Sequence, residues 1–311
     1  MARAERLRGT AWGRGLIGVV RAARGVMRYG RDAVEDAYVG ARFRRGGLQT
    51  VVWNGLTITE TRHDPYARMV AFGRTAQLAR EAAACRLLIT DPAPVIFDVG
   101  ANIGIVSLGV SAIPGATVYA FEPARAPFAC LERNVAQNRR PNVIAVNCGL
   151  SDRAGDRFIG TPAPSQDPRY ARRDAAKTGL FSVHALARGG AGERARFTTM
   201  DAFCAERGID RISYVKIDVE GDEVACLAGG KSTLTRARPI CQVEVNAFSL
   251  GIAGIGPRDV FASLHDLGYA LFVFDGARFH PAPLEELARR PRVLEELYAV
   301  PDEAVRARGL A

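Results

Sequence analysis

The chain has 311 residues, of which 48% are hydrophobic, and its formal net charge is +9. This length and composition suffice for one large α/β domain with extensions, and no apolar run approaches membrane-spanning length. The six cysteines are scattered without a C-x-x-C pair, which argues against a disulfide framework or a zinc site and favours reduced thiols in a cytoplasmic protein.

The positive charge is concentrated at the N-terminus. Residues 1–45 hold eleven arginines against four acidic side chains, a net of +7, which leaves about +2 for the rest of the chain. A near-neutral body does not indicate a nucleic-acid-binding surface, so no specific nucleic acid is expected as a partner. We expect residues 1–45 to be a basic, solvated extension. The alternative is peripheral contact with the anionic inner face of a membrane.

Residues 46–93 are expected to form an N-terminal hairpin and a lid helix. Residues 48–59 carry β-branched side chains around Asn54-Gly55, which is a strong hairpin signal. Residues 73–90 show the apolar stripe of a helix. The polar segment 63–72 lies between hairpin and helix, and by this position alone it could lie over the cofactor.

The core domain is expected over residues 94–283 and begins with the stretch PVIFDVGANIG. Its first apolar residues are typical of a strand covered on both faces, and Asp98 stands where that strand ends. A strand that leads through a Gly-rich turn into a helix lets a ligand approach the backbone. The small residues of the turn, which are candidate cofactor contacts together with Asp98, are Gly100, Ala101, Asn102 and Gly104.

The spacing of this turn distinguishes two classes of cofactor. Dinucleotide enzymes need G-x-G-x-x-G, but Asn102 and Ile105 occupy the second and third glycine positions here. The pattern D-x-G-x-N-x-G instead resembles motif I of class I methyltransferases, which bind S-adenosylmethionine. The second strand, 116–121, ends on Glu122, whose carboxylate could accept both hydroxyls of a ribose.

Further cofactor contacts are expected after the third strand, residues 142–146. The turn that follows lies where the adenine should rest, and its candidate contacts are Gly149, Leu150 and Asp152. An additional β insertion is expected next, with strands at 156–160 and 194–199. The polar, Pro- and Gly-rich stretch between those strands is typical of a functional loop or of disorder. Asp201 is expected to cap a short helix.

A second group of ionisable residues follows the fourth strand. Lys216, Asp218 and Glu220 alternate, which places them on one face near the strand end, and Glu244 is embedded in the neighbouring strand. Carboxylates at the carboxyl end of a parallel sheet indicate a site, so these four are the candidate catalytic residues. Asp218, oriented by Lys216, could take the proton of an acceptor hydroxyl. Alternatively Asp218, Glu220 and Glu244 could hold a divalent cation, and the sequence does not decide between these roles.

The remaining chain is expected to contain two helices, a closing hairpin and a helical tail. One helix is expected over residues 223–234 and another over 260–267. Residues 269–280 are expected to form the hairpin around Asp275-Gly276. Residues 284–311 are expected to form a charged helical tail.

Several motifs occur in the order found in the FkbM-family methyltransferases, and the chain resembles that family over about residues 50–303. The resemblance implies a class I methyltransferase Rossmann-like α/β fold, with a mostly parallel seven-stranded sheet, helices on both faces and an antiparallel closing hairpin. It also implies S-adenosylmethionine as methyl donor. The motifs are DVGANIG (98–104), FEP (121–123), GLSD (149–152), TTMDAF (198–203), VKIDVEGDE (215–223) and LYAVPDE (297–303).

The function implied by this resemblance is O-methylation of a hydroxyl on a small-molecule, glycan or natural-product acceptor. One alternative is an RNA or protein methyltransferase that uses the Arg-rich N-terminus for docking. Another is a non-catalytic scaffold that keeps the fold.

Overall fold

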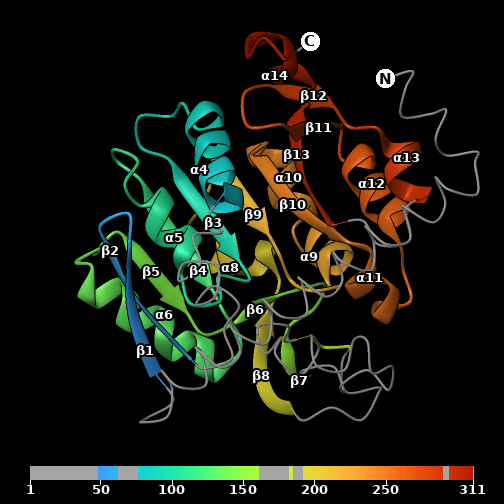
Figure 1. Cartoon of the computed structure of the whole chain (residues 1–311). Helices are drawn as coiled ribbons and strands as arrows, with labels where there is room; N and C mark the ends of the chain where they lie inside the picture. The colour runs from blue at the N-terminus through green and yellow to red at the C-terminus, as the bar shows by residue number, and fades with distance from the viewer. Residues whose placement is uncertain (1–47, 62–75, 161–181, 185–191, 290–293, 311) are drawn as a thin grey trace, which may run out of the picture. The chain divides into compact units, whose positions relative to one another are not determined.

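The structure is a computed structural model that describes residues 48–61, 76–160, 182–184, 192–289 and 294–310 (Figure 1). The basic extension, the segment before the lid helix and most of the insertion loop lie outside the described residues, so the hypotheses made for them stay predictions. Residues 50–311 form one compact unit. No helix in the described ranges has the length and apolarity required to cross a membrane.

A mostly parallel sheet of eight strands lies at the centre of this unit, in the order β12-β11-β13-β10-β9-β3-β4-β5 (Figure 1). The five strands from β10 to β5 are mutually parallel, whereas β13 pairs antiparallel with both β10 and β11, and β12 pairs antiparallel with β11. The strands are β3 (Val95–Val99), β4 (Thr117–Phe121), β5 (Val143–Val146), β9 (Tyr214–Ile217), β10 (Ile240–Asn246), β11 (Tyr269–Phe274), β12 (Phe279–Pro281) and β13 (Leu294–Pro301).

Helices cover both faces of the sheet, which confirms the predicted fold class. Successive strand residues point to opposite faces, so Ile96 packs into one hydrophobic cluster and its neighbour Phe97 into the other. The first face is covered by α4 (Ala76–Leu88), α5 (Ile105–Val110), α6 (Arg125–Gln137) and α14 (Asp302–Ala307). The second face is covered by α8 (Met200–Arg207), α9 (Glu223–Gly229), α10 (Lys231–Ala237), α11 (Ala247–Ala253), α12 (Pro257–Asp266) and α13 (Leu284–Arg289).

The expectation of a helical tail after residue 283 is wrong. Among the described residues of that segment only α13 and α14 are helical, and β13 between them enters the sheet between β10 and β11. Leu297, Ala299 and Val300 of this strand are fully buried. The predicted closing hairpin, β11 and β12, therefore joins the parallel strands through β13, and the sheet has one strand more than predicted.

The N-terminal hairpin is confirmed, with β1 (Leu48–Trp53) and β2 (Leu56–Thr61) joined at Asn54-Gly55. Both turn residues have positive φ, +48° and +76°, as a tight hairpin turn requires. Asn134 of α6 fastens β2 to the core. Its Oδ1 accepts the N–H of Thr59 at 2.6 Å, and its Nδ2 donates to the carbonyls of Thr59 at 2.9 Å and Ile103 at 2.8 Å.

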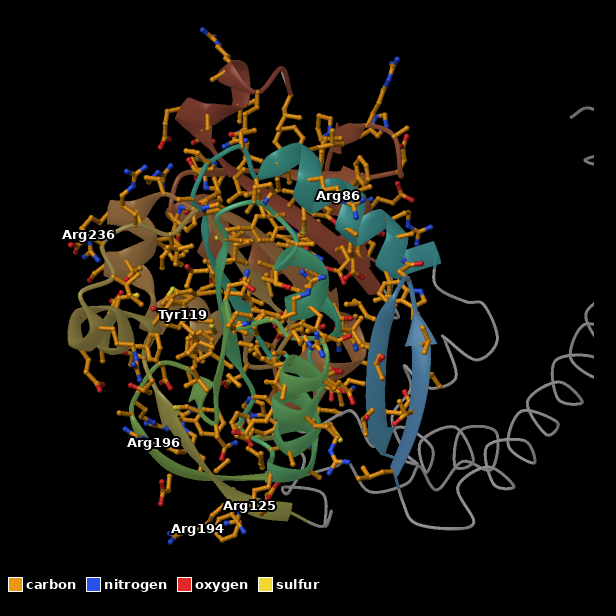
Figure 2. All side chains as sticks on the ribbon, turned by 90° about the vertical axis from the view of Figure 1, so that its left-hand side faces the viewer. Arg86, Tyr119, Arg125, Arg194, Arg196 and Arg236 are labelled. Carbon is orange, nitrogen blue, oxygen red and sulfur yellow. The ribbon has the colours of Figure 1, made fainter. Side chains whose placement is uncertain are left out.

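The β insertion is a three-stranded sheet, ordered β6 (Gly149–Leu150), β8 (Gly192–Thr198) and β7 (Gly155–Gly160). The two predicted strands are present, and the third, β6, is the turn in which adenine contacts were expected. On β8 the side chains alternate: Ala195 and Phe197 are buried, whereas Arg194 and Arg196 are exposed and point outward (Figure 2). This small sheet thus has one apolar and one charged face.

Two local predictions after the insertion are wrong. The helix expected over 223–234 is broken into α9 and α10 at Gly229-Gly230, where a Cβ would overlap the carbonyl of Ser151 or approach the sulfur of Met200. Asp201 does not cap its own helix, because Thr199 does so by accepting the N–H of Ala202. Asp201 instead accepts the N–H groups of Ser232 and Thr233, in the first turn of α10.

Glu223, the first residue of α9, is a buried carboxyl group behind the carboxyl end of β9. It is 1% exposed, and it accepts the N–H of Gly221 at 3.1 Å and that of Val219 at 3.4 Å. Burial raises the pKa of Glu223 to about 7; the negative charge of Asp218 adds to the rise, whereas the backbone hydrogen bonds oppose it. The folded protein therefore holds this proton more tightly than the unfolded chain does.

This shift predicts a pH-dependent stability. The contribution of Glu223 to stability is complete below about pH 4.5, the ordinary pKa of the group, and is lost as the pH rises through about 7. Relative to Glu223→Gln, the free energy of unfolding of the wild type should therefore fall by on the order of 2 kcal/mol between pH 5 and pH 8. Urea unfolding at several pH values measures this, with Glu206→Gln on the exposed side of α8 as control. A constant difference between wild type and Glu223→Gln would contradict the prediction.

A second prediction concerns the attachment of the hairpin. Asn134→Ala removes the partner of three backbone groups, so the free energy of unfolding should fall by about 2–3 kcal/mol. Chemical denaturation measures the loss, and Asn147→Ala, which removes an amide with weaker, partly exposed contacts, serves as the matched control. Equal stability of the Asn134 variant and the wild type would show that the hairpin does not depend on this side chain.

Candidate active site

The turn between β3 and α5 approaches the backbone that follows β9. Gly100, Asn102 and Gly104 all have positive φ, between +50° and +87°. A Cβ on Gly100 would overlap the carbonyl oxygen of Asp218, and one on Gly104 would overlap the side chain of Leu131. Glycine is therefore required at both positions, for its conformation and for the close approach of two chain segments. This contact joins the two predicted groups of site residues.

Glu122 holds this turn in place from the tip of β4. Its Oε2 accepts the N–H of Asn102 at 2.9 Å, and its Oε1 accepts the N–H of Ala124 at 2.8 Å. The side chain is buried. Both bonds fix the carboxylate beside the turn, at the position where the sequence predicted a ribose contact.

The backbone of the turn is less available than the sequence suggested. The N–H groups of Gly100 and Ala101 both donate to the carbonyl of Phe121, at 3.0 and 2.8 Å. Ala101 itself is buried against the first face of the sheet. The side-chain oxygen of Asn102, Oδ1, is buried and has no hydrogen-bond partner among the described residues. A donor group on a ligand would satisfy it.

Asp98 occupies a supporting position beneath the turn. It is 1% exposed, and its Oδ2 accepts the hydroxyl of Ser107 at 2.5 Å, which ties β3 to α5. Burial raises the pKa of Asp98, although the nearby Lys216 ammonium and the Ser107 hydroxyl oppose this. Its second oxygen, Oδ1, is buried and has no hydrogen-bond partner among the described residues, and the cofactor contact expected of Asp98 stays a prediction.

The predicted adenine contacts have structural partners. Leu150 is 1% exposed within the main hydrophobic core, and Gly149 packs so closely on the ring of Phe197 that no Cβ fits. Asp152 forms an ion pair with Arg157, 2.7 Å from its Nη2. These contacts join β6 to β8, and the turn after β6 to β7, and an adenine contact by these residues stays a prediction.

Lys216 is buried on the first face of the sheet and forms an ion pair with Asp218, with 2.7 Å between Nζ and Oδ2. Burial alone would lower the pKa of Lys216, but the attraction of four surrounding carboxylates outweighs burial and raises it well above its usual value. Lys216 is therefore a permanent cation here and not a base. The carboxylates are those of Asp218, Glu296, Asp98 and Glu81.

Three carboxylates meet beside this pair. Asp218, Glu220 and Glu244 each offer an oxygen that lies within 4.8 Å of the other two, so we call them the carboxylate cluster. The register of β9 and β10 accounts for Asp218 and Glu244, because Lys216 pairs with Gln242 and each acidic residue follows two positions later. Glu220 lies beyond the end of β9, which is at Ile217. The structure thus brings together the residues that the sequence predicted, while their chemical roles stay predictions.

Two members of the cluster differ in environment. Glu220, at φ +50°, accepts the hydroxyl of Ser249 at 2.5 Å and the amide of Asn246 at 3.5 Å. Glu244 is 9% exposed, and its Oε2 has no hydrogen-bond partner in the described part of the chain. Burial, followed by the charges of Asp218 and Glu220, raises the pKa of Glu244 well above its usual value.

Ser249 and Asn246 were missed in the sequence analysis. Asn246 caps α11 by accepting the N–H groups of Phe248 and Ser249, at 3.2 and 3.4 Å, and that turn brings Ser249 to Glu220. An Asn directly after a strand is a signal for such a cap. The contact with Glu220, however, depends on the positive φ of that residue, which no sequence pattern indicated.

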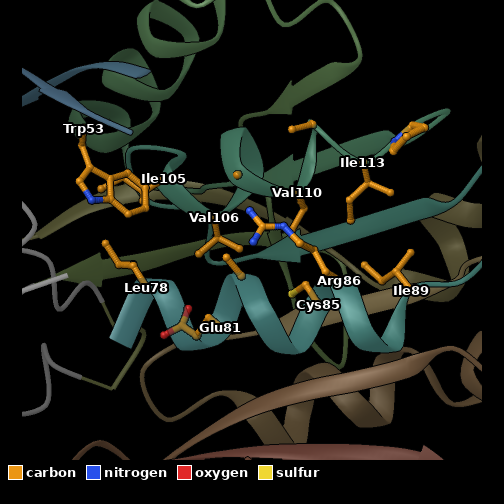
Figure 3. Close-up of a pocket in the computed structure, with 14 residues that line it drawn as sticks. Trp53, Leu78, Glu81, Cys85, Arg86, Ile89, Ile105, Val106, Val110 and Ile113 are labelled. Carbon is orange, nitrogen blue, oxygen red and sulfur yellow. The ribbon is translucent and has the colours of Figure 1, made fainter. Parts of the chain in front are cut away.

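A separate apolar cavity of about 280 Å³ lies between α4 and α5 (Figure 3). Trp53, Leu78, Val106 and Val110 contribute to its walls, and Arg86 extends across it. None of the residues of the turn or of the carboxylate cluster lines it. It therefore belongs to the outer helical layer and not to the candidate active site.

Comparison with known proteins gives the following similarities. The chain is 35% identical over 156 residues to the 31-O-demethyl-FK506 methyltransferase FkbM of Streptomyces tacrolimicus, covering 44% of this chain and 60% of that protein. It is 30% identical over 163 residues to the 2-O-methyltransferase NoeI of Sinorhizobium fredii, covering 49% of this chain and 63% of that protein. The matches thus span less than two thirds of either relative.

Among solved structures, methyltransferase FkbM from Methylobacillus flagellatus is similar over 86% of this chain and 59% of its own, at 14% identity and a TM-score of 0.37. The model of the methyltransferase FkbM domain matches residues 98–271, from the end of β3 to the middle of β11. Because that match covers more than half of the chain and includes both groups of site residues, the protein belongs to the FkbM methyltransferase family.

Proposed function

We propose that this protein transfers a methyl group from S-adenosylmethionine to a hydroxyl oxygen of a sugar, glycan or natural-product acceptor. The observation that carries the proposal is the contact between Gly100 and the backbone of Asp218, because it sets the donor-type turn directly against the carboxylate cluster. Methyl transfer requires donor and acceptor groups within attack distance, and this contact supports such a juxtaposition.

The residues of the turn fit the proposed donor. The unpartnered Oδ1 of Asn102 is suited to accept from the ammonium group of its methionine part. The carboxylate of Glu122, already fixed by two backbone N–H groups, is suited to accept from the ribose hydroxyls. S-Adenosylmethionine supplies an electrophilic methyl group on a sulfonium.

The acceptor side requires a group that takes up one proton. In the transfer, a lone pair of the acceptor oxygen forms the new C–O bond, and the electron pair of the C–S bond returns to sulfur, leaving a neutral thioether. The hydroxyl proton passes to a carboxylate, for which Asp218 is the proposed base, oriented by Lys216 at 2.7 Å. The names of the two relatives describe O-methylation, which supports oxygen as the acceptor atom.

Experiments distinguish this proposal from its two alternatives, an RNA or protein methyltransferase and a scaffold without activity. Methylation of RNA or protein rests on residues 1–45, which lie outside the described residues. A scaffold without activity predicts no binding of S-adenosylmethionine, which isothermal titration calorimetry measures directly. A screen of glycans and glycosylated metabolites with labelled methyl donor then identifies the acceptor.

The first prediction of this proposal concerns the donor. Glu122→Gln keeps the shape of the side chain but removes its charge, so the affinity for S-adenosylmethionine should fall by about 1.5–3 kcal/mol. Calorimetry measures the affinity, and a thermal melt confirms that the variant is folded. An unchanged affinity in the folded variant removes Glu122 from the donor site.

The second prediction concerns the acceptor. Asp218→Asn should lower kcat by about 10²–10⁴-fold while S-adenosylmethionine binds as in the wild type, because a positioned base acts in the chemical step. Asp210→Asn, an exposed Asp outside the site, is the matched control. Wild-type turnover by a folded Asp218 variant would show that this carboxylate is structural.

A further inference from the structure

The side chain of Glu244 has an unexplained position. It projects from β10 and is 9% exposed. One of its oxygens, Oε2, has no hydrogen-bond partner among the described residues. Burying a carboxyl group without a partner is costly, and native structures seldom leave such an atom unexplained. The explanation should lie in what the side chain faces.

Glu244 faces two further carboxylates. One oxygen from each of Asp218, Glu220 and Glu244 lies within 4.8 Å of the others, which is the separation expected for oxygens that surround a common centre. Three ionised carboxylates at such distances repel one another, so the cluster is stabilised either by a proton on one member or by a positive charge among all three. Lys216 does not fill that role for all three, because its ion pair is with Asp218.

Neighbouring groups orient two members of the cluster. Lys216 donates to Oδ2 of Asp218 at 2.7 Å, and Ser249 donates to Oε2 of Glu220 at 2.5 Å. The two hydrogen bonds thus fall on one named oxygen of each carboxylate, Oδ2 of Asp218 and Oε2 of Glu220. Hydrogen bonds that orient a ligating carboxylate through one oxygen are the usual support of a metal site.

We propose that Asp218, Glu220 and Glu244 bind a hard divalent cation of the Mg²⁺ or Mn²⁺ type. All three donors are carboxylate oxygens, which these cations prefer, and the described residues bring no thiol or imidazole into the cluster. Mg²⁺ commonly keeps water or substrate oxygens in its remaining positions. Water or an acceptor oxygen would take the coordination positions that the three carboxylates leave to the cation.

This inference rests on the proposed function and refines it. The contact of Gly100 with the Asp218 backbone places the cluster against the donor turn, so an acceptor hydroxyl on the cation would lie next to the donor. Coordination lowers the pKa of a bound hydroxyl, which makes its oxygen a better nucleophile at neutral pH. An acceptor with neighbouring oxygens, such as a sugar, suits a cation with several open positions.

The test uses the full-length protein and Mn²⁺ alone, without donor or acceptor. Titration followed by electron paramagnetic resonance should show one Mn²⁺ bound per chain and displaced by Mg²⁺. Glu244→Gln should weaken that binding by about 10–100-fold, whereas Glu206→Gln, an exposed glutamate on α8, should leave it unchanged. If Glu244→Gln does not fold, Glu220→Gln, which changes a less buried member of the cluster, replaces it.

The outcomes separate this inference from the proposed function. Absence of stoichiometric Mn²⁺ binding, or equal affinity in the wild type and the cluster variants, overturns the cation site. Methyl transfer that is indifferent to chelator overturns the part given to the cation in the reaction and leaves the methyltransferase proposal standing. Tight Mn²⁺ binding that is weakened in Glu244→Gln supports the cation site. If calorimetry also finds no binding of S-adenosylmethionine, that result counts against the proposed function alone.

Discussion

The buried ammonium of Lys216 is the charge around which the site is arranged. Moving a lysine out of water costs several kcal/mol unless opposite charges surround it. Here the ion pair with Asp218 and the carboxylates of Asp98 and Glu296 provide those charges. The same attractions hold Asp218 at the end of β9, directly beside the turn that follows β3. The need to neutralise the buried Lys216 ammonium thereby positions the Asp218 carboxylate in the candidate active site.

The backbone places the same two segments together independently of charge. Gly100 allows the turn after β3 to touch the carbonyl of Asp218, and Glu122 holds the turn from the other side through the N–H of Asn102. The parallel strands β9, β3 and β4 therefore present their carboxyl ends as one packed edge. Ligands of open α/β sheets bind at this edge, since the loops there converge.

The sequence was sufficient for these features because they follow from local patterns. The period of two residues predicted that Asp218 shares a face with Lys216, and parallel strands predicted that Glu244 lies near them. Glu220 does join the cluster, but it lies beyond the strand and at positive φ, so the period of two does not account for it. It was insufficient for β13, because LEELYAVP contains helix-favouring residues and becomes a strand only through pairing with β10 and β11. The contact between Ser249 and Glu220 likewise depends on a left-handed residue that tertiary structure imposes.

The strand that the sequence analysis missed also determines the charge of the site. Its antiparallel register places Glu296 opposite Glu244 on the same face, and Gln242 donates to Glu296 at 2.8 Å. Acidic groups therefore continue from the cluster across three strands, with Lys216 as the buried cation among the described residues of that face. Burial, followed by the charge of Glu81, raises the pKa of Glu296 to about 8, although the Lys216 ammonium opposes that rise. The missed strand therefore adds a second carboxyl group with a raised pKa beside Glu244, which no local sequence pattern indicated.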